Sequence, residues 1–266
     1  MKILVLGSKG QLGRCLNDQL LSTDHYVVYT SRDQIDVADF NRTKRLLSEL
    51  SPDVVINATA YTAVDKAEED HEQAYLINNL AVANIANICN ELDCWLLHIS
   101  TDYIFDGTSS LPYKESDQAN PQGVYGQSKL MGEESVQASG CKYLIFRTAW
   151  VFSEYGNNFL KTMLRLGETH EELRVVDDQI GCPTAAHDIA RVLISILPYI
   201  ETTDSSSGIY NICSDSPCSW YDFARKIFKL AEAAGFCTPN NVYPISSSEY
   251  PTKAIRPSYS VLDCSK

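Results

Sequence analysis

The start of the chain places the strongest constraint on its fold. An apolar segment at 2–6 runs directly into three glycines at three-residue steps, Gly7, Gly10 and Gly13, and a helical pattern follows. Glycines at these points allow a tight turn, close backbone approach to a ligand and close packing of helix on strand. The first N–H groups of such a helix can hold a pyrophosphate. The segment predicts a dinucleotide-binding turn, although its spacing differs by one residue from the common pattern, so a plain strand-to-helix turn stays open.

The alternation of strand and helix continues through the first half of the chain. Short β-rich apolar segments alternate with longer helical patterns, which predicts βαβ units around a parallel sheet. The expected strands in this half are 2–6, 26–29, 53–57, 94–99 and 143–147. We therefore expect an α/β fold, a Rossmann-type doubly wound parallel sheet with a smaller C-terminal substrate-binding lobe.

The predicted division of the chain follows the same pattern. Residues 1–149 are expected to form the NAD(P)-binding domain, with 172–198 returning to it, while 150–171 and 199–266 form the smaller lobe. Further helices are expected at 68–91, 158–166, 187–197 and 219–234, and further strands at 173–176 and 208–212.

Two segments with unusual composition receive structural interpretations. Acidic residues in 65–72 fall in the first turns of the helix expected at 68–91, where they complement the helix dipole rather than carry out chemistry. The segment 239–257 holds four prolines, too many for a central helix or strand, so a fixed coil is expected there.

Charge and cysteine content narrow the class of protein. A formal net charge of -12 opposes binding to nucleic acid or to an anionic membrane surface. The nine cysteines include no C-x-x-C pair, which indicates free thiols in a reducing compartment rather than a disulfide framework. Because every apolar run is shorter than the roughly 18 residues of a membrane span, we expect a soluble, cytoplasmic protein.

The end of the second strand bears on the choice of cofactor. This strand is followed by Ser31 and Arg32, without the acid that would bond an adenosine 2′-hydroxyl. Arg32 can pair with a 2′-phosphate instead, so the sequence predicts NADPH, with NADH possible. Asp33 and Asp36 follow closely, and a solvated surface arginine is the alternative interpretation.

Residues suited to carbonyl reduction follow the fourth strand. Thr101 and Asp102 come directly after an apolar run, at the sheet edge where open α/β folds bind ligands. Tyr125 and Lys129 are four residues apart and share one helical face. Reduction of a carbonyl needs a proton donor for the oxygen, and a lysine ammonium can make a tyrosine more acidic. Alone, this pair occurs often by chance; with the glycine turn and the threonine, the pattern indicates a reductase.

The glycine turn, the threonine and the Tyr–Lys pair follow one another along the chain in the order typical of one enzyme superfamily. They resemble the short-chain dehydrogenase/reductase superfamily, extended branch, whose catalytic set is Ser or Thr, Tyr and Lys. Further segments resemble the dTDP-4-dehydrorhamnose reductase family along nearly the whole chain. They are NATAYTAVDKAE at 57–68, STDYIF at 100–105, FRTAWV at 146–151, GNNF at 156–159, DQIGCPT at 178–184 and RP at 256–257. The resemblance implies that NAD(P)H reduces the 4-keto group of dTDP-4-dehydro-β-L-rhamnose, the last step of dTDP-rhamnose biosynthesis.

The resemblance also implies roles for particular residues. Tyr125 would be the proton donor, Lys129 would tune it and hold the nicotinamide ribose, and Thr101 would hydrogen-bond the keto oxygen. The implied cofactor contacts are Gly10, Gln11, Leu12, Asp39, Phe40, Ala60, Tyr61 and Thr62, besides Gly7, Gly13 and Arg32 from the residue patterns. The implied sugar contacts are Thr62, Val64, Thr101, Asp102 and Trp150, with a core position open for Trp150 and a capping or turn role open for Asp102.

The chain departs from the family at one position, and other functions stay open. Some members dimerise around Mg²⁺ held by glutamates, and Cys15 stands where the first of these would sit, so no metal is expected. Monomer and homodimer both stay open. The alternatives are a nucleotide-sugar 4,6-dehydratase or 4-epimerase, a reductase of another nucleotide sugar, or a non-catalytic NADP-binding subunit resembling the methionine adenosyltransferase β subunit. The dehydratase lacks support because Tyr103, rather than an acid, follows Asp102.

Overall fold

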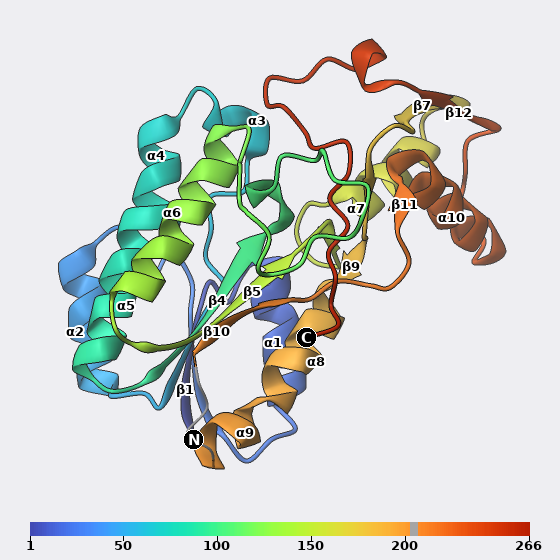
Figure 1. The fold of residues 1–266 in the computed structure, drawn as a ribbon. Coiled ribbons are helices and arrows are strands. Elements are labelled where there is room, and N and C mark those ends of the chain that lie inside the picture. The colour runs from blue at the N-terminus through green and yellow to red at the C-terminus, as the bar shows by residue number, and fades with distance from the viewer. Residues whose placement is uncertain (203–206) are drawn as a thin grey trace.

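A six-stranded parallel sheet forms the centre of the molecule in the computed structural model, which describes residues 1–202 and 207–266 (Figure 1). Its strands are β1 (Lys2–Leu6), β2 (Tyr26–Thr30), β3 (Val54–Asn57), β4 (Trp95–Thr101), β5 (Lys142–Thr148) and β10 (Gly208–Asn211). Their order across the sheet is β10-β5-β4-β3-β1-β2, and every neighbouring pair is parallel. The doubly wound α/β fold is confirmed.

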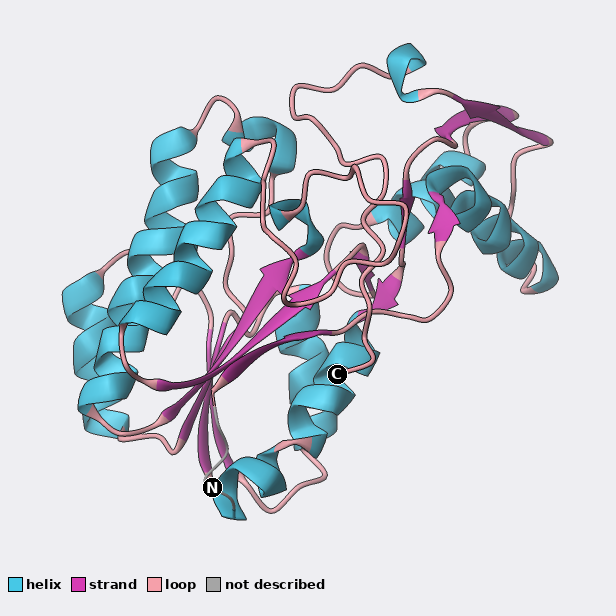
Figure 2. Cartoon of the chain, viewed as in Figure 1, coloured by secondary structure: helices cyan, strands magenta, loops and turns pink. Residues whose placement is uncertain are grey.

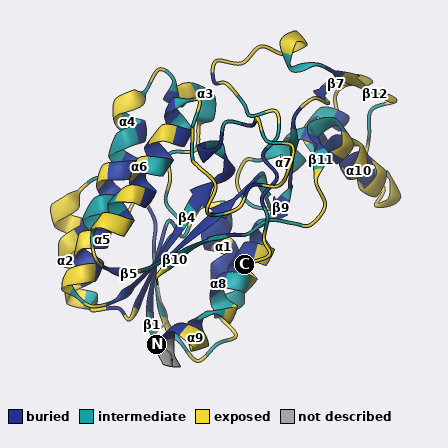
Figure 3. Cartoon of the chain, in the orientation of Figure 1, coloured by how far each residue is buried: buried dark blue, intermediate teal, exposed yellow. Residues whose placement is uncertain are grey.

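Helices cover both faces of this sheet (Figure 2). Residues along β1 alternate between two cores: Ile3 and Val5 join one, and Leu4 and Leu6 join the other. Because both faces are covered, the strands are mainly apolar, and buried residues concentrate in the sheet (Figure 3). The helices α1 (Gln11–Leu20) and α8 (Ala186–Ser195) pack on one face, and α2 (Phe40–Leu50), α5 (Ala81–Glu91) and α6 (Val124–Ala138) pack on the other.

A smaller body with its own core lies beyond the carboxyl ends of the strands (Figure 1). It contains α7 (Phe159–Gly167), β7 (Glu172–Val176), α10 (Trp220–Ala233) and β12 (Asn241–Ile245). Two short pairs adjoin it: β6 (Val151–Phe152) with β9 (Thr184–Ala185), and β8 (Ile180–Gly181) with β11 (Cys218–Ser219). Among the described residues, no helix is both long and apolar enough to cross a membrane.

Two segments lie on the other side of the expected boundary between domain and lobe. Strand β10 pairs with β5 in the central sheet, although 199–266 was assigned to the lobe. Strand β7 pairs with β12 outside that sheet, although 172–198 was expected to return to the first domain. Only the later part of 172–198, helix α8, packs on the sheet. Substrate binding by the smaller body stays a prediction.

The proline-rich segment is not entirely coil. Strand β12 includes Pro244 and pairs in parallel with β7. A strand with one neighbour has an open edge, and an edge strand tolerates a residue without an N–H. The prediction of coil over 239–257 was therefore wrong for β12 and for a 3-10 turn at Ser247–Glu249.

The helix expected at 68–91 is present over most of its length. Most of it forms one uninterrupted helical run, in which α4 (His71–Tyr75), a π-helical turn at Leu76–Leu80 and α5 follow one another without a gap. The start differs from the prediction, because residues 68–70 separate this run from a short helix α3 (Val64–Ala67). The carboxylate of Glu68 accepts from the Val124 N–H at 2.8 Å, at the start of α6. That long-range bond ties down a residue in the gap between α3 and α4, and apolar spacing cannot reveal such a bond.

Candidate active site

The glycine turn is shaped for close approach of a ligand. Gly7 has a φ of +86°, and a Cβ added there would lie 2.9 Å from the Ala58 carbonyl oxygen. A Cβ on Gly13 would lie 2.3 Å from the Gly7 oxygen. Only glycine therefore fits at either position. The turn ends at Gly10, the N-cap of α1, whose first N–H groups have no partner within the helix.

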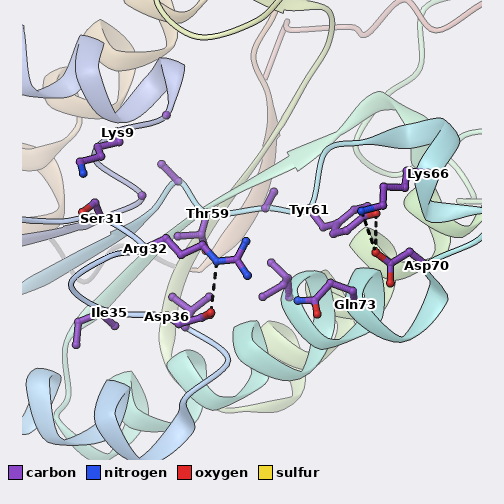
Figure 4. A pocket seen from close by; sticks show the side chains of 16 residues that line it. Lys9, Ser31, Arg32, Ile35, Asp36, Thr59, Tyr61, Lys66, Asp70 and Gln73 are labelled. Atoms are coloured by element: carbon purple, nitrogen blue, oxygen red, sulfur yellow. Dashed lines mark hydrogen bonds and ion pairs between the residues drawn. The ribbon is translucent and has the colours of Figure 1, made fainter.

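A cavity of about 500 Å³ opens beside this turn, at the carboxyl ends of β1, β2 and β3 (Figure 4). Of the predicted cofactor residues, Gly7, Gly10, Arg32, Ala60 and Tyr61 line it. The other lining residues are Lys9, Ser31, Ile35, Asp36, Val37, Ala58, Thr59, Lys66, Asp70, Gln73 and Ile77. The shape, the open helix N-terminus and the cations fit a dinucleotide. Sequence reasoning did not assign Lys9 or Gln73, which no pattern in a single chain distinguishes from surface residues.

Other predicted cofactor contacts lie outside this lining. The carboxylate of Asp39 caps α2 by accepting from the Arg42 N–H at 3.0 Å, and Phe40 is partly exposed at the start of the same helix. The side chain of Gln11 bonds Ser153 and Asn158, so it joins α1 to the start of the smaller body. Leu12 is buried in the core of the sheet. Roles for these residues in cofactor binding stay predictions.

Two cations stand at the mouth of the cavity. Arg32 Nε lies 3.4 Å from Asp36 Oδ2, and Lys9 pairs with Asp33. Both cations are mainly exposed, and in Figure 4 the Arg32 side chain lies among the cavity residues. An exposed pair is weak, so Asp36 does not prevent Arg32 from pairing with a phosphate.

The predicted catalytic residues come together at the ends of β4 and α6. Thr101 is the last residue of β4, and Tyr125 lies in the first turn of α6 with Lys129 one turn later. The Thr101 hydroxyl donates to Asp102 Oδ1 at 3.1 Å and bonds the side chain of Tyr125. The ring of Tyr103 meets that of Tyr125 edge-on at 5.5 Å.

Burial dominates the acidity of the predicted proton donor. Burial and the nearby Asp102 carboxylate raise the pKa of Tyr125 to about 12, and the Thr101 hydroxyl partly offsets this rise. Burial lowers the pKa of Lys129 to about 8, opposed by Glu133 one turn further along α6. The Lys129 ammonium donates to the Ile99 carbonyl at 2.6 Å. The groups that set the pKa of Tyr125 here are its burial, Thr101 and Asp102, and do not include Lys129. That Lys129 lowers the pKa of Tyr125 stays a prediction.

A buried imidazole next to Lys129 has its tautomer fixed by neighbours. The Asn57 amide oxygen accepts from the Thr59 N–H and hydroxyl, so Asn57 Nδ2 must donate to His98 Nδ1, 3.2 Å away. The proton of neutral His98 then lies on Nε2, which is 3.4 Å from Lys129 Nζ. Burial and Lys129 hold the pKa of His98 well below its ordinary value. A ring N–H facing an ammonium disfavours the charged lysine, in agreement with its lowered pKa.

The π-helical turn connects the cavity with α6. Its residue Asn78 accepts from the Tyr61 N–H at 2.8 Å and donates to the Ser128 hydroxyl at 3.0 Å. Gly132 of α6 lies so close that an added Cβ would be 2.2 Å from the Asn78 carbonyl oxygen. The irregular turn thus fixes the cavity residue Tyr61 relative to the helix that carries Tyr125, which agrees with the frequent presence of π-helical turns at functional sites.

Trp150 belongs to an aromatic stack rather than to the central core. Its ring stacks on Trp220 with centroids 3.4 Å apart and an interplanar angle of 5°. A Cβ on Gly181 would lie 2.5 Å from the Trp150 ring, so glycine leaves room for it. The backbone φ of Trp150 is +48°, an uncommon conformation for a large residue. Such strain is typical of functional positions, but sugar binding by Trp150 stays a prediction.

Asp65 of α3 makes long-range contacts that its neighbours in sequence do not indicate. Asp65 binds Arg256 through two bonds, of 3.1 and 2.7 Å, and accepts from the Ala254 N–H. The hydrogen bond and charge of Arg256 lower the pKa of Asp65. Asp65 lies in the first turn of a helix, as the expected dipole role requires, and it binds Arg256 in addition. Val64 precedes it in α3 and Thr62 is exposed, so both predicted sugar contacts adjoin this ion pair.

Comparison with known proteins assigns the chain to a family. The family model described as RmlD substrate binding domain matches residues 1–266. The chain belongs to the RmlD family. The dTDP-4-dehydrorhamnose reductase of Escherichia coli K12 is 38% identical, with 100% of this chain and 90% of that protein aligned.

Solved structures of similar proteins agree. The dTDP-4-dehydrorhamnose reductase of Clostridium acetobutylicum has a TM-score of 0.92 and 42% identity, covering 99% of this chain and 90% of that one. The corresponding protein of Bacillus anthracis, crystallised with NADP, has a TM-score of 0.91 and 36% identity at the same coverage. The predicted resemblance to the RmlD family is confirmed.

One group of side chains in this RmlD family member could approach a metal ion. Among the described residues, Cys15, Glu154 and His187 bring three possible ligand atoms within 4.8 Å of one another. Burial, Glu154 and Asp18 raise the pKa of Cys15 to about 11, and His187 Nε2 is already bonded to Glu154 at 2.9 Å. A protonated thiol is a poor metal ligand, so these three side chains do not favour a metal ion. That the protein needs no metal stays a prediction.

Asp102 gives a testable link between the site and stability. Burial raises its pKa from 3.8 to about 6, against the bonds from Ser260 and Thr101, and its Oδ2 has no partner among the described residues. The folded protein thus holds this proton more tightly than the unfolded chain, so stability falls as pH rises through this window. At about 1.4 kcal/mol per pKa unit, the loss near neutral pH is about 2 to 3 kcal/mol.

We therefore expect Asp102→Asn to raise the free energy of unfolding at neutral pH by that amount, and to change it little below about pH 4. Urea unfolding of both proteins at the two pH values measures the difference. Equal stability at neutral pH would contradict the buried, unpartnered carboxylate.

Proposed function

We propose that this chain is an NADPH-dependent reductase that converts the 4-keto group of dTDP-4-dehydro-β-L-rhamnose into the hydroxyl of dTDP-β-L-rhamnose. The observation that carries the proposal is the meeting of Thr101, Tyr125 and Lys129 at the end of β4, in a chain that the RmlD family model matches over residues 1–266. Homologues named for this reaction support the substrate.

The residues divide the chemistry among them. When NADPH is bound, it supplies the hydride to the keto carbon. The glycine turn and the N-terminus of α1 hold the pyrophosphate, and Arg32 holds the 2′-phosphate. The Thr101 hydroxyl bonds the keto oxygen, and Tyr125 gives it a proton as negative charge develops. Lys129, held by the Ile99 carbonyl, lies one turn from Tyr125 and replaces the proton that the phenol loses.

We expect the substrate to bind beside these groups. The proposed contacts are Trp150, which stacks on Trp220 of the smaller body, the Asp65–Arg256 pair, and Thr62 and Val64, which are close to Asp65 in sequence. The Arg256 side chain is 22% exposed although it pairs with Asp65, so its guanidinium can also contact the charged diphosphate of a nucleotide sugar. In the structure the single hydrogen of the Thr101 hydroxyl is donated to Asp102, so this hydroxyl would turn from Asp102 to the keto oxygen when the substrate binds.

The decisive experiment supplies the purified protein with NADPH and dTDP-4-dehydro-β-L-rhamnose. We expect oxidation of NADPH with one rhamnose product formed per cofactor consumed, identified by its stereochemistry. Tight NADPH binding without oxidation would favour the non-catalytic subunit, and product without net NADPH consumption would favour an epimerase. A panel of other 4-keto nucleotide sugars separates this reductase from one that acts on a different sugar.

Arg32 provides the test of cofactor preference. We expect a higher kcat/KM with NADPH than with NADH, because the second strand ends without an acid and Arg32 faces the cavity. Arg32→Ala should lower kcat/KM for NADPH by about tenfold, the size of one partly exposed charge-assisted contact, and should leave NADH nearly unchanged. Steady-state kinetics with both cofactors measure this, with Arg191→Ala as the control. Equal losses for the two cofactors would count against a 2′-phosphate contact.

A cytoplasmic location fits a substrate and cofactor that are both made there, and it belongs to the same proposal. The protein would work as a monomer or a homodimer, without nucleic acid or membrane partners.

A further inference from the structure

Two cysteines that the proposed chemistry does not use lie in contact at the junction of the central sheet and the C-terminal segment. Cys213 lies just after the end of β10, and Cys264 lies in the C-terminal segment of the chain. Their sulfur atoms are 3.5 Å apart, and the Cys213 N–H donates to Cys264 Sγ at 3.3 Å. Neither cysteine forms a disulfide bond. The contact joins two residues that are 51 positions apart in sequence.

The two thiols differ in access and in acidity. Cys264 is exposed, whereas Cys213 is partly buried and its Sγ lies 3.6 Å from the Leu262 carbonyl oxygen. The Cys213 thiol and N–H stabilise the Cys264 thiolate and lower its pKa to about 7, against Glu115 and Asp263. A thiolate is the nucleophile in thiol oxidation. Cys264 therefore combines access to solvent with reactivity, and Cys213 stands within reach as its partner.

The segment that carries Cys264 also reaches the active site. We call residues 258–264 the strap. Its Ser260 N–H donates to the Ile180 carbonyl and its Asp263 N–H to the Tyr113 carbonyl, each at 2.8 Å. The Ser260 side chain lies near Asp102, the neighbour of Thr101, and lowers the pKa of that carboxyl. The strap thus joins the thiol pair to the site through a few ordered residues.

We propose that Cys213 and Cys264 form a peroxide-sensitive dithiol whose oxidation ties the strap to the central sheet. The Cys264 thiolate attacks peroxide, forming an S–O bond as the O–O bond breaks and hydroxide leaves. The Cys213 thiol then attacks the sulfenic sulfur, the S–S bond forms and water departs. Two thiols are oxidised by two electrons, and one peroxide is reduced to water. This inference does not depend on the proposed substrate.

A third thiol offers a competing partner. Cys182 is buried, and its side chain contacts that of Cys213. Because an oxidant reaches buried sulfur poorly, we expect Cys182 to stay reduced while Cys264 reacts first. A disulfide between Cys182 and Cys213 would not include Cys264, so it would not join the strap to the central sheet as we propose.

The test treats the intact, folded protein with a small excess of hydrogen peroxide, followed by alkylation and peptide mass mapping. We expect a linked peptide containing Cys213 and Cys264, two fewer alkylated residues than the nine of the reduced chain, and reversal by dithiothreitol. Cys264→Ser should prevent the link. Cys213→Ser should leave a sulfenic acid on Cys264 that dimedone traps. Cys237→Ser, at an exposed cysteine after α10, is the matched control and should link normally.

The rate of alkylation gives a second readout that does not require oxidation. Alkylation of Cys264 in the reduced protein should have a pH midpoint near 7, and Cys213→Ser should move that midpoint upward because one donor to the thiolate is lost. A Cys182–Cys213 link, a dimer linked between chains, or peroxide treatment that leaves both thiols alkylatable would overturn the proposal.

Discussion

Replacing Tyr125 with phenylalanine is expected to lower kcat by about 10² to 10⁴-fold, the usual contribution of a positioned general acid. The phenol is the group at the carboxyl end of β4 that can deliver a proton beside Thr101, and burial keeps that proton in place by raising its pKa to about 12. Phenylalanine retains the ring that packs on Tyr103, so folding and cofactor binding should persist. Single-turnover and steady-state NADPH oxidation measure the loss.

A second tyrosine near the same helix is the matched control. The Tyr75 hydroxyl donates to Gln127 of α6 at 3.1 Å on the surface. Tyr75→Phe removes one phenol beside α6 without touching the site, and its kcat should stay within about twofold of the parent. If Tyr125→Phe retained similar activity, the proton would come from another group and the proposed mechanism would be wrong.

The largest effect on stability is expected from breaking the buried ion pair behind the site. Arg147 of β5 donates to Glu133 of α6 at 3.1 and 2.7 Å, and their side chains are 5% and 0% exposed. Arg147→Met leaves the carboxylate buried with Ser100 as its remaining side-chain donor. The expected loss is about 3 to 5 kcal/mol of unfolding free energy, since an unpaired charge stays away from water. Urea unfolding measures it as a lower midpoint with little change in slope.

Two further variants separate the buried charge from lost packing. Arg191 pairs with Asp188 at 2.7 Å on the surface, and Arg191→Met should change stability by less than about 0.5 kcal/mol. Adding Glu133→Leu to Arg147→Met removes the stranded carboxylate and should recover much of the loss. A double variant no more stable than Arg147→Met would show that packing, rather than charge, sets the effect.

Local patterns predicted the strands and the front of the site because the physical signals were local. The segment before Gly7 is apolar because β1 is covered on both faces, and its boundaries in the structure are those expected. The prediction that Tyr125 and Lys129 lie one turn apart on the same helix is also confirmed, since both belong to α6. Features that depend only on residues close together in sequence were therefore predicted correctly.

Contacts between distant residues were the part that could not be predicted. Nothing near Asp65 indicates that Arg256, 191 positions away, will bind it. Pro244 disfavoured a strand by its own chemistry, but an edge position beside β7 removed the objection. The π-helical turn at Asn78 likewise depends on the close approach of Gly132. Each of these features is decided by a neighbour in space rather than in sequence.

The return of β10 to the central sheet limits how this enzyme can be rebuilt. A fragment ending at residue 149 would lack the sixth strand and leave the backbone N–H and C=O groups of β5 open to pairing with other molecules. A chimera that exchanges the smaller body for another specificity must therefore replace two segments, one between β5 and α8 and one after β10, instead of joining two modules end to end.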